Sequence, residues 1–194
     1  FNEINDLPKG SRVGSCSLRR IVQLKAIRPD LAILDLRGNV NTRLMKLDKG
    51  EYDAIILACA GLIRLGFEDR IKQPLDAQTS LPAVGQGALG IENRKGDEVV
   101  RELIKPLIDS KTMTEVLAER AMNATLEGSC SVAIAGYAKT IGEELLLKGL
   151  VGNVESGSIL RAENTGTTSQ PKALGELVAN QLLEIGAGKL LEGG

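Results

Sequence analysis

The chain has 194 residues with 24 basic and 25 acidic side chains, and this balance argues against general nucleic-acid binding, for which a basic excess is expected. Aromatic residues make up only 2% and histidine is absent, which argues against a base-stacking platform and removes the commonest general base and metal ligand. No apolar run is long enough to span a membrane, and three cysteines without a C-x-x-C motif favour reduced thiols in the cytoplasm.

The first predicted elements alternate between strand and helix. Residues 12–14 predict a short strand, after which Ser15-Cys16-Ser17 opens a helix with apolar positions at helical spacing. Pro29 ends this helix, and residues 31–36 predict a second strand. This order is typical of a strand–helix–strand unit with parallel strands.

A second helix and a third strand complete the series. Asn39 is a candidate N-terminal cap for the helix, and Gly50 closes it. The continuous apolar run from Ala54 to Ala60 is typical of a strand buried on both faces, which would place Cys59 in the core. The resulting βαβαβ series predicts a parallel, doubly wound sheet.

The rest of the chain changes character twice. Residues 73–96 are rich in glycine and proline and predict an interdomain crossing with one short strand at 88–92. Two helices are predicted next, at 98–108 and 112–126. The pattern after Gly128 then predicts a small α+β unit with a three-stranded antiparallel sheet, made of strands at 132–139, 145–151 and 159–163 and a helix at 172–183.

Five arginines follow the predicted strands or lie in the first turn of the next helix. In an open parallel sheet these positions lie at the carboxyl edge, where ligands bind. Cations in a first helical turn oppose the helix dipole, and an anionic ligand would explain them. The alternative is that each is a solvated surface charge paired with a nearby acid. The five are Arg19, Arg20, Arg37, Arg43 and Arg64.

Three further features have two interpretations each. Ser15 and Ser17 would either cap the first helix or donate to an anion. Cys130, in a Gly/Ser turn, is either a nucleophile or covalent attachment point, or a quiet structural thiol. The run from Gly85 to Gly90 matches a dinucleotide-binding fingerprint, but no well-defined strand precedes it and no helix follows, so we interpret it as a hinge or a backbone-packing element. A nucleotide-binding enzyme is the corresponding alternative.

Five motifs occur together in one order, and in this combination the chain resembles the porphobilinogen deaminase family over its whole length. They are Gly14-Ser-Cys-Ser-Leu-Arg-Arg20, Leu36-Arg-Gly-Asn-Val-Asn-Thr-Arg43, Gly50-Glu-Tyr-Asp-Ala-Ile-Ile-Leu-Ala58, Leu81-Pro-Ala-Val-Gly-Gln-Gly-Ala88, and Ala118-Glu-Arg-Ala-Met-Asn123 with Leu126-Glu-Gly-Ser-Cys130.

The resemblance implies an α/β fold: a periplasmic-binding-protein-like parallel βαβαβ domain, then a small α+β domain. Residues 1–82 would be domain 2, residues 83–108 a crossover returning to domain 1, and residues 109–194 domain 3. Most of domain 1 would lie upstream of Phe1, so the chain would be a C-terminal fragment. Ser129, Ala133 and Cys16 depart from the usual family residues Gly, Pro and Ser or Thr.

The resemblance also implies the site. Cys130 would carry a dipyrromethane cofactor through a thioether, with Ser15 and Ser17 near it and Gln86 in a hinge strand beside it. The five arginines would bind the acetate and propionate groups of the cofactor and the growing chain. The catalytic Asp would lie upstream, so this fragment would hold no catalytic residue.

The implied activity is the head-to-tail condensation of four porphobilinogens to hydroxymethylbilane with loss of ammonia, a transferase reaction of heme biosynthesis. Its partners would be porphobilinogen and the growing polypyrrole chain, with no nucleic acid and no membrane. The full-length enzyme would be a cytoplasmic monomer. We expect the fragment alone to be inactive and without cofactor. The competing interpretation is a non-enzymatic anion-sensing module with a binding-protein fold, which explains the arginines but not Cys130.

Overall fold

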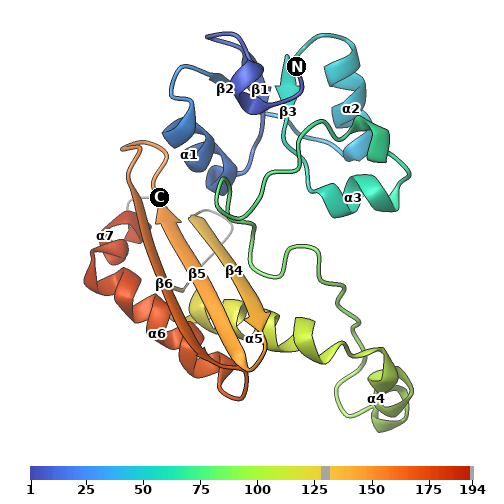
Figure 1. Cartoon of the computed structure of the whole chain (residues 1–194). Helices are drawn as coiled ribbons and strands as arrows, with labels where there is room; N and C mark the ends of the chain where they lie inside the picture. Colours follow the sequence, from blue (N-terminus) through green and yellow to red (C-terminus); the bar gives the residue numbers. More distant parts are fainter. Residues whose placement is uncertain (128–131, 193–194) are drawn as a thin grey trace.

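The computed structural model describes residues 1–127 and 132–192, and its first part is a parallel α/β unit (Figure 1). The three strands form one parallel sheet in the order β2-β1-β3, which confirms the predicted parallel βαβαβ series. The elements are η1 (Ile4–Asp6), β1 (Arg12–Gly14), α1 (Leu18–Ile27), β2 (Ala32–Leu34), α2 (Val40–Asp48), β3 (Ala54–Ile55), α3 (Cys59–Arg64) and η2 (Glu68–Arg70).

Helix α2 begins and ends at the residues that the sequence indicates. The Asn39 side chain accepts a hydrogen bond from the Thr42 amide at 2.8 Å and caps α2. Gly50 follows α2 with a φ of 72°, a left-handed conformation that glycine adopts without strain. Apolar side chains from β1, α1 and the loops beside them pack into one core, which holds α1 against the sheet.

The prediction of one long buried strand over Ala54–Ala60 is wrong. Only Ala54 and Ile55 pair with β1, and the run turns into helix α3 from Cys59. Because β3 is an edge strand with β1 on one side only, its residues are half-buried. A short apolar run does not by itself distinguish a strand from a helix, which is the reason for the error. Cys59 is accordingly half-buried and outside the core.

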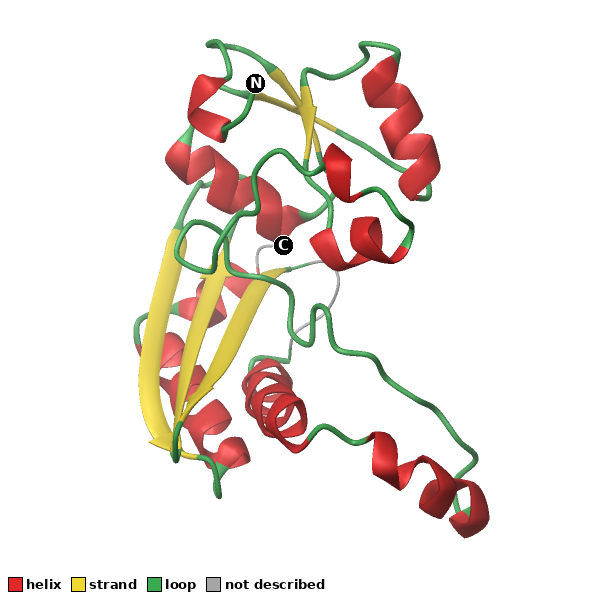
Figure 2. Ribbon diagram, turned by 45° about the vertical axis from the view of Figure 1, so that its right-hand side comes forward, coloured by secondary structure: helices red, strands yellow, loops and turns green. Residues whose placement is uncertain are grey.

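The crossing segment also differs from its prediction. Residues 88–92 form no strand, and they pair with no other strand in the described parts of the chain. The segment continues through α4 (Glu98–Ile104) and η3 (Lys105–Leu107) as an arm that projects away from both units (Figure 2). Leu89 is 83% exposed and Leu103 73% exposed, so apolar side chains on this arm face solvent.

The second unit has the predicted α+β architecture. Its strands form an antiparallel sheet in the order β4-β5-β6, and α5 and α6 cover one face of it (Figure 1). The α5–α6 crossing is close at Gly175, where a Cβ atom would lie 2.3 Å from the Ala118 carbonyl oxygen. The elements are α5 (Ser110–Thr125), β4 (Ala133–Ile141), β5 (Glu144–Gly152), β6 (Ile159–Thr167), α6 (Pro171–Glu184) and α7 (Ala187–Glu192).

Two consecutive residues join the units. The buried Gln23 side chain of α1 accepts from the Leu81 amide at 2.8 Å and donates to the Leu81 carbonyl at 3.1 Å. The next residue, Pro82, accepts a hydrogen bond from the Gly136 amide of β4 at 3.1 Å. Leu81 also packs against Ala135 and Leu150, so the crossing is anchored in both units before the arm begins.

Of the helices in residues 1–127 and 132–192, none has the length and apolar character needed to cross a membrane.

Candidate anion-binding site

The site lies at the carboxyl edge of the parallel sheet, where α1 begins. Arg20, in the first turn of α1, donates from Nη1 to the Ile56 carbonyl oxygen at 2.8 Å, just after β3. This bond draws the guanidinium across the edge of the sheet. It also couples the residues that follow β1 to those that follow β3.

Arg19 is buried, with 8% of its surface exposed. It donates from Nη1 to the Leu81 carbonyl at 2.8 Å and from Nη2 to Oε1 of Gln86 at 3.2 Å. Burial lowers the pKa of Arg19 to about 10, and the positive charge of Arg20 acts in the same direction. At neutral pH the group stays charged, so the protein holds a desolvated cation at this edge.

Arg43 brings a third charge to the same place. Its Nε donates to the Gly38 carbonyl at 2.7 Å, and burial followed by the Arg43 charge lowers the pKa of Arg20. Among residues 1–127 and 132–192, no acidic side chain forms an ion pair with Arg19, Arg20 or Arg43. Three like charges without a carboxylate partner make a region of positive potential that favours an anionic ligand.

The other two arginines do not join this cluster. Arg37 pairs with Asp35 at 2.9 Å, and its side chain is 81% exposed, so in this structure it matches the interpretation as a paired surface charge. Arg64 is the exposed last residue of α3 rather than the residue after a strand. Because the predicted third strand stops at Ile55, the chain carries Arg64 one helix away from the sheet edge.

The two serines have different environments. Ser15 is buried, and its Oγ accepts from the Ser17 amide at 3.3 Å. Ser17 occupies the N-terminal cap position of α1, yet its side chain makes no capping hydrogen bond. The half-buried Ser17 hydroxyl is therefore free to meet a ligand at the N-terminus of the helix.

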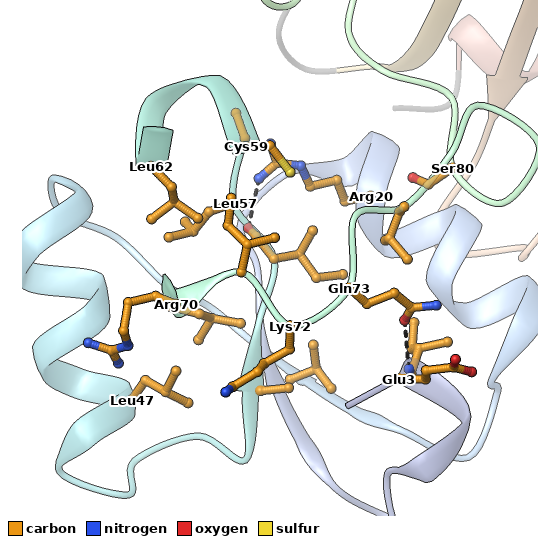
Figure 3. Close-up of a pocket in the computed structure, with 18 of the residues that line it drawn as sticks. Glu3, Arg20, Leu47, Leu57, Cys59, Leu62, Arg70, Lys72, Gln73 and Ser80 are labelled. Carbon is orange, nitrogen blue, oxygen red and sulfur yellow. Dashed lines mark hydrogen bonds between the residues drawn. The ribbon is translucent and has the colours of Figure 1, made fainter. Parts of the chain in front are cut away.

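A cavity of about 620 Å³ extends from the arginines along β3 (Figure 3). Arg19, Arg20 and Gln86 border it at the sheet edge, and Lys72 contributes a further cation, whereas Arg70 in the same wall is paired with Asp48. Figure 3 shows Cys59 beside Arg20, and much of the remaining wall is aliphatic. An apolar cavity bordered by cations suits a ligand with a flat apolar body and carboxylate substituents.

Two glutamines support Arg19. Gln86 lies in a turn over residues 84–87, which corrects its prediction as part of a hinge strand. The second is Gln23, which is 1% exposed and whose Nε2 donates to the Arg19 carbonyl at 3.1 Å. The sequence-based prediction did not include Gln23 among the site residues. A polar residue on the buried face of an amphipathic helix was the available indication.

Cys130, the predicted attachment point, lies outside the described residues, as does Ser129. Cys16 is exposed at the start of α1, and its thiol and that of Cys59 are close enough to Arg20 to act on its pKa. Within residues 1–127 and 132–192, no group of three or more Cys, Asp or Glu side chains is arranged to hold a metal ion.

We expect a polycarboxylate to stabilise the folded chain through this site. Citrate should raise the melting temperature, because bound anion stabilises the native state by about 2.7 kcal/mol at one hundred times Kd. Differential scanning fluorimetry would measure the shift, with chloride at matched ionic strength as the control. A shift equal to that with chloride would contradict a specific anion site.

Family models match both halves of the chain. The model described as "Porphobilinogen deaminase, dipyromethane cofactor binding domain" matches residues 1–102. The model described as "Porphobilinogen deaminase, C-terminal domain" matches residues 113–184. The first match covers the region assigned above to domain 2 and most of the crossover, so it does not support the expectation that most of the first domain is missing.

Two curated relatives are similar to nearly the whole chain. Porphobilinogen deaminase from Ruthia magnifica subsp. Calyptogena magnifica is 62% identical over 192 residues, which cover 99% of the chain and 63% of the relative. The protein of the same name from Vesicomyosocius okutanii subsp. Calyptogena okutanii (strain HA) is 58% identical over the same shares. The chain thus spans about three fifths of the length of these relatives. With a family model over more than half of its residues, the chain belongs to the porphobilinogen deaminase family.

Proposed function

We propose that the protein containing this chain condenses four porphobilinogens head to tail into hydroxymethylbilane, with loss of ammonia, in heme biosynthesis. The observation that carries the proposal is the cluster of Arg19, Arg20 and Arg43 at the sheet edge, for which residues 1–127 and 132–192 supply no ion-pairing carboxylate. Porphobilinogen carries acetate and propionate groups, and the growing chain carries more of them with each addition. Guanidinium groups bind such carboxylates through paired hydrogen bonds.

We assign the recognition of these carboxylates to residues from α1 and α2. Arg19 and Arg20 would hold the inner carboxylates, and Arg43 would hold the next one along the sheet edge. Ser17 would donate its hydroxyl to the same groups, with Ser15 orienting the turn. Arg37 and Arg64 would meet carboxylates only further out, since both are exposed in this structure.

Cys130 is the proposed attachment point of a dipyrromethane through a thioether. The bound group would supply a nucleophilic pyrrole carbon to which porphobilinogen is added. In the sequence, Cys130 follows three residues after Glu127, the last described residue behind α5, whose φ of 51° turns the backbone out of the helix. The arginines neutralise carboxylates and hold them in place, which lowers the entropic cost of bringing the reacting carbons together.

We also propose that the proton-transferring carboxylate is supplied by residues outside this chain. The acids that line the cavity are Glu3 and Asp53, and Asp53 is bound to Arg12 at 2.8 Å. Neither belongs to the arginine cluster. The isolated chain would then be inactive and would keep Cys130 as a free thiol.

The wider assignments are proposals on the same basis. Residues 1–82 would form a periplasmic-binding-protein-like domain, residues 83–108 a crossover and residues 109–194 the attachment domain. The family models, which end at residue 102 and resume at 113, support a division in this region. We propose a cytoplasmic, monomeric enzyme that acts without nucleic acid or membrane. An anion-sensing module remains the alternative, favoured by the same arginine cluster.

The test compares the chain alone with a chimera in which it is joined to the part of the Ruthia magnifica relative that it does not cover. Both are incubated with porphobilinogen, assayed with an aldehyde reagent for pyrroles, and weighed by mass spectrometry. We expect substrate consumption and a dipyrromethane adduct on Cys130 in the chimera only. A folded but inactive chimera would contradict the proposed reaction, and an active isolated chain would contradict only the external carboxylate.

A further inference from the structure

The outer edge of β4 is closed by groups from other elements. In the antiparallel sheet, alternate amides of this edge strand point away from β5. The amide of Gly136 donates to Pro82, that of Ala138 to Oε1 of Glu119 at 2.8 Å, and that of Thr140 to Oε1 of Glu115 at 2.8 Å. Two glutamates four residues apart on α5 therefore accept hydrogen bonds from the same strand.

Glu119 differs from Glu115 in what its second oxygen does. Oε2 of Glu119 accepts a hydrogen bond from the Gly85 amide at 2.6 Å, in the turn over residues 84–87. Glu119 is 6% exposed, whereas Glu115 is half-buried. A single buried carboxylate thus joins α5, the edge of β4 and the turn over residues 84–87.

That turn carries the residue that contacts the arginine cluster. Gln86 follows Gly85 directly, and its side chain accepts from Arg19. Gly85 has a φ of 68°, a left-handed conformation in which its amide points toward α5 while the next side chain faces α1. Moving the Gly85 amide would therefore move Gln86 relative to Arg19.

The chemistry of the contact requires a carboxylate. Each carboxylate oxygen of Glu119 accepts a hydrogen bond from one backbone amide. A glutamine side chain has only one acceptor oxygen, so it could not accept both bonds in the same way. Burial raises the pKa of Glu119, and the two amide bonds oppose that rise by favouring the charged form. Within the described parts of the chain no cation pairs with it, so the two amides are what stabilise the buried charge.

We propose that Glu119 is a positioning residue for the carboxylate-binding site: through Gly85 and Gln86 it sets the position of the Arg19 guanidinium, although it lies in the other unit of the chain. This inference rests on the proposed function, because it assumes that Arg19 binds the carboxylates of porphobilinogen. It links the α+β unit to the anion site by four residues in contact, Glu119, Gly85, Gln86 and Arg19.

The experiment uses the 194-residue chain with Glu119→Gln, and with Glu115→Gln as the matched control on the same helix and strand. Amide hydrogen exchange at Gly85 and the Kd for porphobilinogen, by isothermal titration calorimetry, are measured in each. We expect Glu119→Gln to speed exchange at Gly85 and weaken binding by about tenfold, the effect of losing one charge-assisted hydrogen bond. Glu115→Gln should leave the Kd within about twofold, because Glu115 bonds only to β4.

A third variant separates positioning from general loss of structure. If Glu119 acts through Gln86, then Gln86→Ala combined with Glu119→Gln should bind no more weakly than Gln86→Ala alone. Additive losses, or equal Kd values for Glu119→Gln and Glu115→Gln, would overturn the inference while leaving the proposed function intact. Failure of the unaltered chain to bind porphobilinogen would overturn the inference as well, whereas the proposed function is contradicted only by a folded but inactive chimera. Melting temperatures of all variants establish that each is folded.

Discussion

Replacing Arg20 by alanine should weaken carboxylate binding by about 10- to 100-fold, the largest effect expected of any single substitution at the site. Arg20 is electrostatically coupled to both of the other arginines. Its charge lowers the pKa of Arg19, and the charge of Arg43 lowers the pKa of Arg20. Its removal leaves a gap in the middle of the cluster. Calorimetric titration with porphobilinogen would measure the loss.

Arg37→Ala is the matched control. Arg37 follows β2 at the same edge, but it is 81% exposed and paired with Asp35, and exposed ion pairs contribute little. We expect its Kd to change by less than about twofold. Equal losses in Arg20→Ala and Arg37→Ala would mean that net charge, rather than the buried cluster, determines affinity.

The Gly175→Ala variant should lose about 2–3 kcal/mol of unfolding free energy, because the added methyl group has no room at the α5–α6 crossing. The new Cβ would lie 2.3 Å from the Ala118 carbonyl oxygen and 2.8 Å from the Met122 amide nitrogen. Both are backbone atoms, so the helices themselves would have to move apart. Urea denaturation followed by circular dichroism would measure the change.

Gly188→Ala provides the comparison within the same unit. Gly188 is helical in α7, and the nearest atom to an added Cβ is Leu183 Cδ2 at 4.0 Å. Alanine favours a helix over glycine, so this variant should be neutral or stabilised by up to about 1 kcal/mol. A Gly175→Ala protein as stable as Gly188→Ala would show that the helix crossing is looser than the structure indicates.

The order and type of the main elements were predictable because each carries a local pattern. Asn39 and Gly50 mark the ends of a helix chemically, and the strands after Gly128 alternate with recognisable turns. The apolar run at Ala54–Ala60 has no such mark inside it. The place where β3 becomes α3 depends on the absence of a second neighbouring strand, which a single sequence does not reveal.

The candidate site was predictable only in part. Arg19, Arg20 and Arg43 were expected at the sheet edge because first-turn positions of helices in a parallel sheet converge there. Arg64 was predicted at the sheet edge because the third strand was predicted to be longer than β3 is. Arg37 forms an ion pair with Asp35, two residues away, which competes with an anionic ligand for its guanidinium group. The contacts of Gln23 with Leu81 and of Glu119 with Gly85 span 58 and 34 residues, and no local pattern indicates them.

The junction at Leu81 and Pro82 has a mechanical consequence. Leu81 is hydrogen-bonded to α1, and the next residue, Pro82, is hydrogen-bonded to β4. Because no residue separates the two attachment points, one unit cannot rotate relative to the other without stretching these hydrogen bonds. The chain regains freedom only after Gly87, where most residues up to the start of α5 are exposed. A movement of this exposed arm would therefore not require the hydrogen bonds of Leu81 and Pro82, beside the arginine cluster, to break.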